Sequence, residues 1–224
     1  MAELRLAVAV LAAGQSRRFG AADKLAAPFG EALLGEQAVR TLGGLACAHR
    51  WVIAASADHP CAPAWSAAGF AVAVNDQAEV GMGTSLALAA RLAIEASADA
   101  LLVALADMPL VPAAHFAALL ARAVALGPDA MVASEADGQR SPPAVFGRNH
   151  LAELAKAEGD QGARHLLGQA EPVTCPPDWL ADVDDSAALA RVRALVTRGN
   201  LVSGHDEDRA TFSRAGMQCS TMMS

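Results

Sequence analysis

The chain has 224 residues, of which 54% are hydrophobic and 18% charged, and its formal net charge is -7. This composition fits a globular protein with a sizeable core and excludes a disordered chain. The acidic balance also argues against non-specific nucleic-acid binding, so we expect no nucleic-acid partner.

Short apolar runs and helical periodicity alternate along the chain, starting with LRLAVAVLA at residues 4–12. That run is rich in Val and Leu and predicts a buried strand. Further strands are predicted over residues 51–55, 70–75, 100–106, 130–134 and 144–146. Helices are predicted over residues 36–45, 84–98, 112–126, 149–157, 160–168 and 186–196. Thr84 and Ser85 suit the N-terminus of the second helix.

Strands that alternate with helices predict a three-layer α/β/α fold with a mostly parallel sheet. We expect one domain over residues 1–197. The remainder, residues 198–224, is polar without apolar periodicity and is interpreted as a mobile tail. In such sheets ligands bind at the C-terminal ends of the strands. The loops at residues 13–24, 80–85 and 107–109 should therefore converge there.

The segment LAAGQSRRFGAADK leaves the first strand and presents glycines and positive charge. Backbone N–H groups of a glycine-rich turn before a helix form a cradle for phosphate. Neither GxGxxG nor GxxxxGK[ST] fits the spacing of this segment. The pattern LAAGxSxRxGxxxK does, and it resembles the molybdenum-cofactor nucleotidyltransferases. The matching positions are Leu11, Ala12, Ala13, Gly14, Ser16, Arg18, Gly20 and Lys24.

This resemblance covers roughly residues 4–196 and implies the Rossmann-like fold of the nucleotide-diphospho-sugar transferases. It implies that Arg18 and Lys24 bind the β- and γ-phosphates, while the loop N–H groups bind the rest. Arg17 fills a variable position. We expect Lys24 to be an exposed loop charge, and an ordinary basic surface loop is the alternative for the pair.

Three further motifs match the family. LADMP at residues 105–109 resembles GDMP, with Ala106 in place of glycine, and Asp107 is a candidate Mg²⁺ ligand or else a turn or helix cap. GMGTSL at residues 81–86 resembles the loop against base and ribose, which makes Gly83, Thr84 and Ser85 candidates for ligand contact or capping. DVDD at residues 182–185 resembles DIDTPED; Asp182 and Asp184 are candidate metal ligands, unless the acids form a solvated helix N-terminus.

The acceptor side shows one match and one departure. GDQGAR at residues 159–164 resembles a family stretch in which Arg164 pairs with the acceptor's phosphate, although a surface arginine on a helix explains it equally. Where relatives show GHP, this chain has Ser141, Pro142 and Pro143. The missing histidine leaves the acceptor's identity open.

The resemblance implies transfer of a nucleoside monophosphate onto a molybdopterin-type acceptor, with Mg²⁺ as cofactor and release of pyrophosphate. CTP is the expected donor, because alanine at position 13 goes with cytidylyl transfer and a second glycine goes with guanylyl transfer. The alternatives are a guanylyl- or sugar-nucleotide transferase and a non-catalytic chaperone that carries the cofactor to a molybdoenzyme.

The remaining residues add little chemistry. Four scattered cysteines form no CxxC pair, which argues against zinc. No histidine lies in the loops above, so we interpret His49, His59, His115, His150, His165 and His205 as structural or surface residues. Apolar runs stay shorter than the about 18 residues that a membrane helix needs. The N-terminus lacks the order of a signal peptide, so we expect a cytoplasmic protein without membrane contact.

Overall fold

The computed structural model describes residues 4–14, 19, 23–159 and 164–197. Within them a seven-stranded sheet has the order β5-β4-β1-β6-β8-β7-β9. Its strands are β1 (Leu6–Leu11), β4 (His49–Ala54), β5 (Ala71–Val74), β6 (Ala100–Leu105), β7 (Met131–Ala136), β8 (Gln139–Gly147) and β9 (Glu171–Thr174). All neighbours pair in parallel except β8, which runs antiparallel to both β6 and β7. The sheet is thus mostly parallel, as the sequence predicts.

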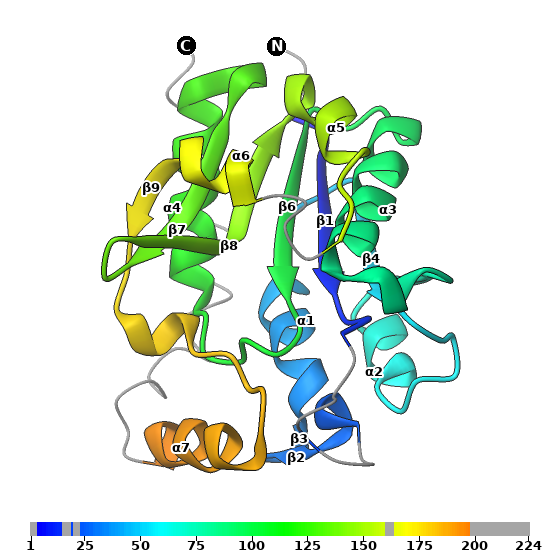
Figure 1. The fold of residues 1–224 in the computed structure, drawn as a ribbon, viewed down its shortest axis with the longest axis vertical. Coiled ribbons are helices and arrows are strands. Elements are labelled where there is room, and N and C mark those ends of the chain that lie inside the picture. The colour runs from blue at the N-terminus through cyan, green and yellow to red at the C-terminus, as the bar shows by residue number, and fades with distance from the viewer. Residues whose placement is uncertain (1–3, 15–18, 20–22, 160–163, 198–224) are drawn as a thin grey trace.

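Helices cover both faces of this sheet (Figure 1). Side chains of α1 (Gln37–Leu42), α2 (Ala62–Ala67), α4 (Ala113–Leu126) and α7 (Ser186–Thr197) contribute to the core on one face. The other face packs against α3 (Met82–Glu95), α5 (Arg148–Leu154) and α6 (Arg164–Gln169). The predicted three-layer α/β/α architecture is confirmed.

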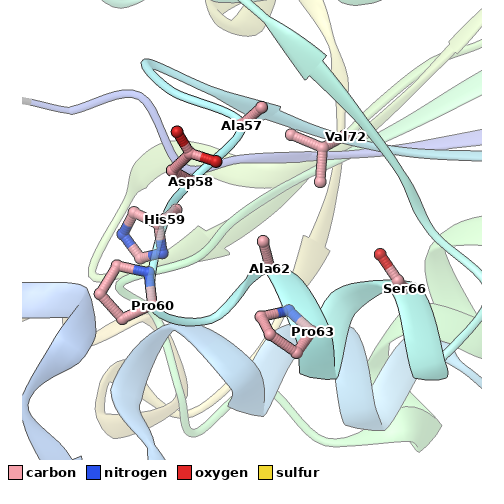
Figure 2. A pocket seen from close by; sticks show the side chains of 8 residues that line it. All are labelled: Ala57, Asp58, His59, Pro60, Ala62, Pro63, Ser66 and Val72. Carbon is pink, nitrogen blue, oxygen red and sulfur yellow. The ribbon is translucent and has the colours of Figure 1, made fainter.

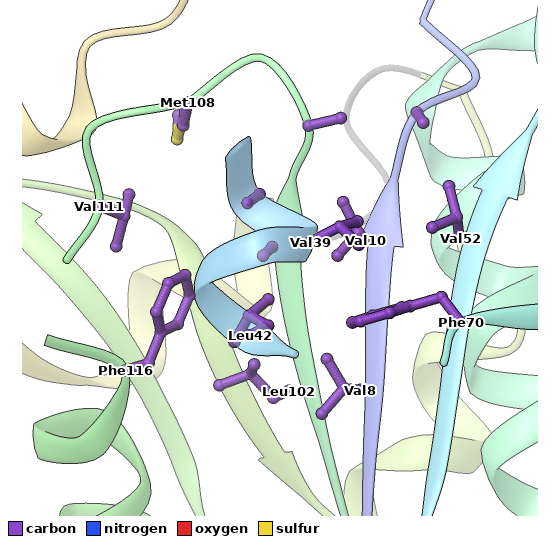
Figure 3. Packing of buried hydrophobic residues seen from close by; sticks show 14 of the residues in the cluster. Val8, Val10, Val39, Leu42, Val52, Phe70, Leu102, Met108, Val111 and Phe116 are labelled. Carbon is purple, nitrogen blue, oxygen red and sulfur yellow. The ribbon is translucent and has the colours of Figure 1, made fainter. Parts of the chain in front are cut away.

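Alternate residues of β1 enter the two cores. Leu6, Val8 and Val10 face the core that contains α1, and Figure 3 shows Val8 and Val10 beside Val39 and Leu42 of that helix. The other side of β1 presents Ala7 and Ala9 to the alanines of α3. A strand buried on both faces has no polar alternation, which is why it reads as a continuous apolar run.

Three features of the fold were not predicted from the sequence. They are α2, β9 and a small antiparallel hairpin of β2 (Pro28–Phe29) and β3 (Ala32–Leu33). All are short, so none carries enough periodicity to be recognised. The strand expected at residues 144–146 is longer, spanning Gln139–Gly147, because its polar first half pairs with β7 through the tight turn at Asp137 and Gly138.

α2 follows β4 through a short loop that contains His59 and Pro60. Together with β5 they border an open hollow of ≈ 590 Å³, and Figure 2 shows His59 and Asp58 at one end of it and Val72 at the other. Trp65 of α2 is fully buried in the core.

α7 lies across the C-terminal end of the sheet, at the same end of the molecule as the β2–β3 hairpin (Figure 1). The Arg193 guanidinium donates to the Pro28 carbonyl, and Leu189 and Val192 belong to the same core as Phe29. This position brings the acidic segment before α7 back to the ends of β1 and β6.

No helix among the described residues is long and apolar enough to cross a membrane.

Candidate active site

Two predicted loops leave the sheet side by side, because β1 and β6 are neighbours. Leu11 pairs with Leu105, and the Ala106 N–H donates to the Leu11 carbonyl at 3.0 Å. Ala12 and Ala13 are still buried, and the chain reaches the surface at Gly14. The start of the glycine-rich loop and the segment around Asp107 therefore emerge at one point of the sheet edge.

Gly14 has no packing reason to be glycine. A Cβ built on it meets no heavy atom of the described residues within 4 Å, and its backbone does not have the positive φ that favours glycine. A glycine without either constraint leaves the backbone open to a group from outside the chain. This is the arrangement expected where a ligand lies against the main chain.

Lys24 is the centre of the site. Its ammonium donates to Asp107 Oδ2 at 2.7 Å and to Asp184 Oδ1 at 3.2 Å. The lysine is only 7% exposed, so the expectation of an exposed loop charge was wrong. The reason is that η1 (Lys24–Ala26) turns the side chain inward, toward carboxylates that lie 83 and 160 residues away in sequence.

The pKa of Lys24 reflects two opposing effects. Burial lowers it, but the charges and hydrogen bonds of Asp107 and Asp184 outweigh the burial, and the pKa is raised above its ordinary value. The ammonium therefore stays charged between the two carboxylates throughout the physiological pH range.

The acidic residues of the DVDD segment, residues 182–185, make different contacts. The Val183 N–H donates to the Asp107 carbonyl at 3.0 Å and fixes this segment beside the end of β6. Asp184 then reaches Lys24, while Asp185 Oδ1 accepts the Ala188 N–H at 2.7 Å and caps α7. Reduced hydration, and after it the charges of Asp184 and Asp107, raise the pKa of Asp182, although this residue is exposed. Thus the helix-cap alternative describes Asp185, and Asp184 belongs to the site.

The carboxylates converge on a cation, and that cation is Lys24. Among the described residues no group of three or more His, Cys, Asp or Glu side chains could hold a metal ion. Asp107 and Asp184 nevertheless offer hard oxygen donors around one position. Magnesium sites that involve nucleotides commonly use one or two carboxylates and complete the shell with phosphate and water. The donor set fits such an ion.

The third loop opens α3, and its hydroxyl groups point into the protein. Asn75, at the end of β5, donates to Thr84 Oγ1 and to Ser85 Oγ, both at 2.9 Å. Both hydroxyl residues are buried. The helix begins at Met82 with Gly81 as its N-cap, so Thr84 and Ser85 stand inside its first turn.

Gly83 brings the predicted acceptor side to this loop. Its N–H donates to the Gly159 carbonyl at 2.8 Å, and a Cβ on Gly83 would lie 2.5 Å from the same oxygen. Only glycine allows the two backbones to approach this closely. The start of α3 and the segment that leads to α6 therefore touch directly.

The arrangement has counterparts among known proteins. Residues 8–173 match the family model of the MobA-like NTP transferase domain. The chain belongs to this family. It is 31% identical over 169 residues to the purine catabolism protein PucB of Bacillus subtilis. The matched region covers 70% of this chain and 78% of PucB.

Solved structures share the fold at lower identity. A nucleotidyl transferase from Methanothermobacter thermautotroptrophicus has a TM-score of 0.69 at 19% identity, covering 87% of this chain and 99% of its own. Molybdopterin-guanine dinucleotide biosynthesis protein A from Archaeoglobus fulgidus has a TM-score of 0.65 at 18% identity, covering 86% and 99%. The protein is accordingly a nucleotidyltransferase of the MobA-like type with the fold of the Rossmann-like nucleotide-diphospho-sugar transferases.

Some residues of the family motif cannot be placed. Ser16, Arg18 and Gly20 lie outside the described residues, as does Arg17. Arg164 begins α6, but its side chain is not described. Their predicted roles stay predictions. The site described above rests on Gly14, Lys24 and the carboxylates.

In place of the family's GHP, this MobA-like transferase has SPP within β8. The Pro143 carbonyl accepts the Ser134 hydroxyl at 2.8 Å, so the neutral His115 ring must donate from Nε2 to Ser134 Oγ, also at 2.8 Å. Burial lowers the pKa of His115. This histidine is structural, as predicted. Through Ser134 it is linked to β8, the strand that contains SPP in place of GHP.

Sequence reasoning missed two polar residues near the site. Asn75 is the last residue of a predicted strand, and it belongs to no sequence motif that would indicate a role for its amide. His59 contacts Asp23, which immediately precedes Lys24, at 2.7 Å, although 36 residues separate the two. Only the return of the chain through β4 brings this histidine to the loop after β1.

Proposed function

We propose that this protein is a cytidylyltransferase that moves CMP from CTP onto the terminal phosphate of a molybdopterin-type acceptor. An oxygen of the acceptor's phosphate attacks the α-phosphorus, the bond from that phosphorus to the bridging oxygen breaks, and pyrophosphate leaves. Such a reaction depends on positioning and charge neutralisation more than on a protein nucleophile. The observation that carries the proposal is the buried Lys24 ammonium between Asp107 and Asp184, at the edge where the glycine loop begins.

In this proposal Lys24 stabilises the departing pyrophosphate together with Arg18. A charge-assisted contact between an ammonium and phosphate oxygen contributes about 1.5–3 kcal/mol. In this proposal the exposed backbone at Gly14 faces the phosphates, since a Cβ built there meets no atom of the described residues within 4 Å. Gly83, Thr84 and Ser85 shape the wall beside the base and ribose through their backbone, since both hydroxyls bind Asn75.

Asp107 and Asp184 would hold Mg²⁺, with Asp182 beside them. A bound magnesium ion neutralises charge on the phosphates and orients them for in-line displacement. The protein's contribution is a pair of carboxylates whose charge is already partly neutralised by Lys24 before any ligand arrives.

The acceptor is proposed to lie on the side of residues 159–164, and the first of these, Gly159, contacts Gly83 at the start of α3. Arg164 is the candidate partner for its phosphate. This class of acceptor is supported by one structural relative, which is named for molybdopterin-guanine dinucleotide biosynthesis. A molybdoenzyme or its chaperone is the proposed recipient of the product.

The preference for CTP is assigned to Ala13. This residue is buried at the turn out of β1, only 5% exposed, so its methyl group acts by holding the backbone that follows. Cytosine, with one ring, needs less room beside that backbone than guanine. Differences of this size give about a 10–200-fold preference.

The test is kcat/KM for CTP and GTP, with Mg²⁺ and a molybdopterin acceptor, in wild type and in Ala13→Gly. We expect wild type to favour CTP and the variant to gain GTP use while it keeps CTP use. A wild-type preference for GTP would assign the protein to guanylyl transfer instead. Nucleotide binding without pyrophosphate release would favour the cofactor chaperone.

A further inference from the structure

We propose that His59, acting through Asp23, is a positioning residue for binding of the triphosphate. The proposal rests on the proposed function, because it concerns the lysine assigned there to the pyrophosphate group. Its basis is a chain of contacts that runs from the loop before α2 to the backbone N–H of Leu25, the residue after Lys24.

Asp23 is the last link of this chain. Its Oδ1 accepts the Leu25 N–H at 2.9 Å and so caps the turn that begins with Lys24. Its Oδ2 accepts from His59 Nε2 at 2.7 Å. The two oxygens of one carboxylate thus connect the start of η1 to a different part of the fold.

His59 is itself held by the protein. Its Nδ1 accepts the Cys61 N–H at 3.0 Å, so the proton of the neutral ring is on Nε2, facing Asp23. The ring stacks on Trp65 with centroids 4.6 Å apart, and its side chain is 9% exposed. Trp65 is fully buried and donates to the Gly35 carbonyl at 2.8 Å. The imidazole is therefore a rigid donor.

The consequence concerns the direction of Lys24. The cap formed by Asp23 sets the backbone of the turn, and the turn directs the ammonium to Asp107 and Asp184. Small errors in the placement of a binding group weaken its contact with the ligand considerably. Loss of the bond between His59 and Asp23 releases the turn and spreads Lys24 over several positions.

The two nitrogens of His59 permit a matched pair of substitutions. In His59→Gln the amide N–H takes the place of Nε2 and keeps the bond to Asp23, but the acceptor for Cys61 is lost. In His59→Asn the amide oxygen takes the place of Nδ1 and keeps the Cys61 bond, but the side chain is too short for Asp23. Both variants lose the stacking on Trp65, so that loss cancels in the comparison. His150→Asn, at a partly exposed position of α5 on the other face of the sheet, is the control.

The experiment measures KM for CTP and for the acceptor, kcat, and the Kd of inorganic pyrophosphate with Mg²⁺ by calorimetry. We expect His59→Asn to raise the KM for CTP and the pyrophosphate Kd at least tenfold, with little change in the acceptor's KM. His59→Gln should stay within about threefold of wild type. Asp23→Ala, which removes the cap itself, should have at least the effect of His59→Asn, and adding His59→Asn to it should cause no further loss.

Equal effects of the Gln and Asn variants, or a larger effect of Gln, would assign His59 only to the fold around Cys61 and overturn the proposal. Additive effects of the His59 and Asp23 substitutions would overturn it as well. If wild type neither binds pyrophosphate nor transfers CMP, the proposed function itself fails, which is a separate result.

Discussion

A lysine that bridges two carboxylates organises this site at the level of single residues. An unpaired ammonium would be costly to bury, and Asp107 and Asp184 would repel each other without a cation between them. Lys24 resolves both problems, and it shares the position with the magnesium ion proposed for the same carboxylates. The residue therefore has a structural role before ligand binds and a proposed phosphate-binding role afterwards.

Lys24→Ala should consequently destabilise the protein as well as weaken binding. Asp184 is half-exposed and screened by water, so we expect a loss of about 1–3 kcal/mol in the free energy of unfolding. Magnesium alone should restore part of this loss by occupying the vacated position. Denaturant unfolding with and without Mg²⁺ measures both effects, with Lys156→Ala, an exposed lysine, as the control. An unchanged unfolding free energy in Lys24→Ala would contradict this view of the pair.

At the level of elements, the start of α3 joins the side of the site proposed for the nucleotide to the side proposed for the acceptor. Asn75 holds the first turn of α3 by hydrogen bonds to the hydroxyl groups of Thr84 and Ser85. In the same turn, the Gly83 N–H donates to the Gly159 carbonyl. The helix itself is apolar and rich in alanine, which lets it lie close to β1. A rigid helix start is a suitable place for two ligands to meet.

Gly83→Ala tests this junction. The new methyl group would lie 2.5 Å from the Gly159 oxygen and 2.8 Å from the Glu158 carbonyl carbon, so the backbone must move. We expect about 1–3 kcal/mol of destabilisation and a raised KM for the acceptor. Gly168→Ala in α6 is the control, because nothing lies within 4 Å of its Cβ and alanine favours helix. Similar melting temperatures for the two variants would show that the backbone around Gly83 and Gly159 accommodates the methyl group without loss of stability, contrary to this prediction.

At the level of the whole molecule, the antiparallel β8 strand extends the parallel sheet and places β7 and β9 beyond it. The pairing of β7 and β8 shifts register at Ser134, and there the buried His115 ring hydrogen-bonds to the Ser134 hydroxyl. We expect this buried polar contact to contribute to the stability of the protein. A buried neutral histidine must gain a charge at low pH, which the folded state disfavours.

Stability should therefore fall as the pH drops below about 6.5, the ordinary pKa of histidine. The pKa of His115 is lowered in the folded state, so the unfolded chain binds the proton first, and the stability present above that pH is lost as acid is added. The slope from this group is at most about 1.4 kcal/mol per pH unit. Unfolding free energies of wild type and His115→Gln between pH 5 and 7.5 should show a flatter profile for the variant, with His150→Gln as the control. Parallel profiles for wild type and His115→Gln would exclude His115 as the cause of the pH dependence.

The alternation of the main strands and helices could be predicted from the sequence, although α2, β9 and the β2–β3 hairpin could not, and so could the sheet edge at which the candidate site lies. Buried parallel strands must be apolar on both sides, as β1 and β6 are, and the ends of parallel strands meet at one edge. The residues Lys24, Asp107 and Asp184 could be named because their segments resemble the family's motifs.

The inward direction of Lys24, the link from His59 to Asp23 and the contact of Gly83 with Gly159 were decided only by the tertiary structure. Each joins residues far apart in sequence, and no local pattern encodes which polar group will face another. Burial depends on how β4, α2 and α7 return to the edge of the sheet. Packing of the whole chain thus turns an ordinary basic loop into a buried cation between two acids.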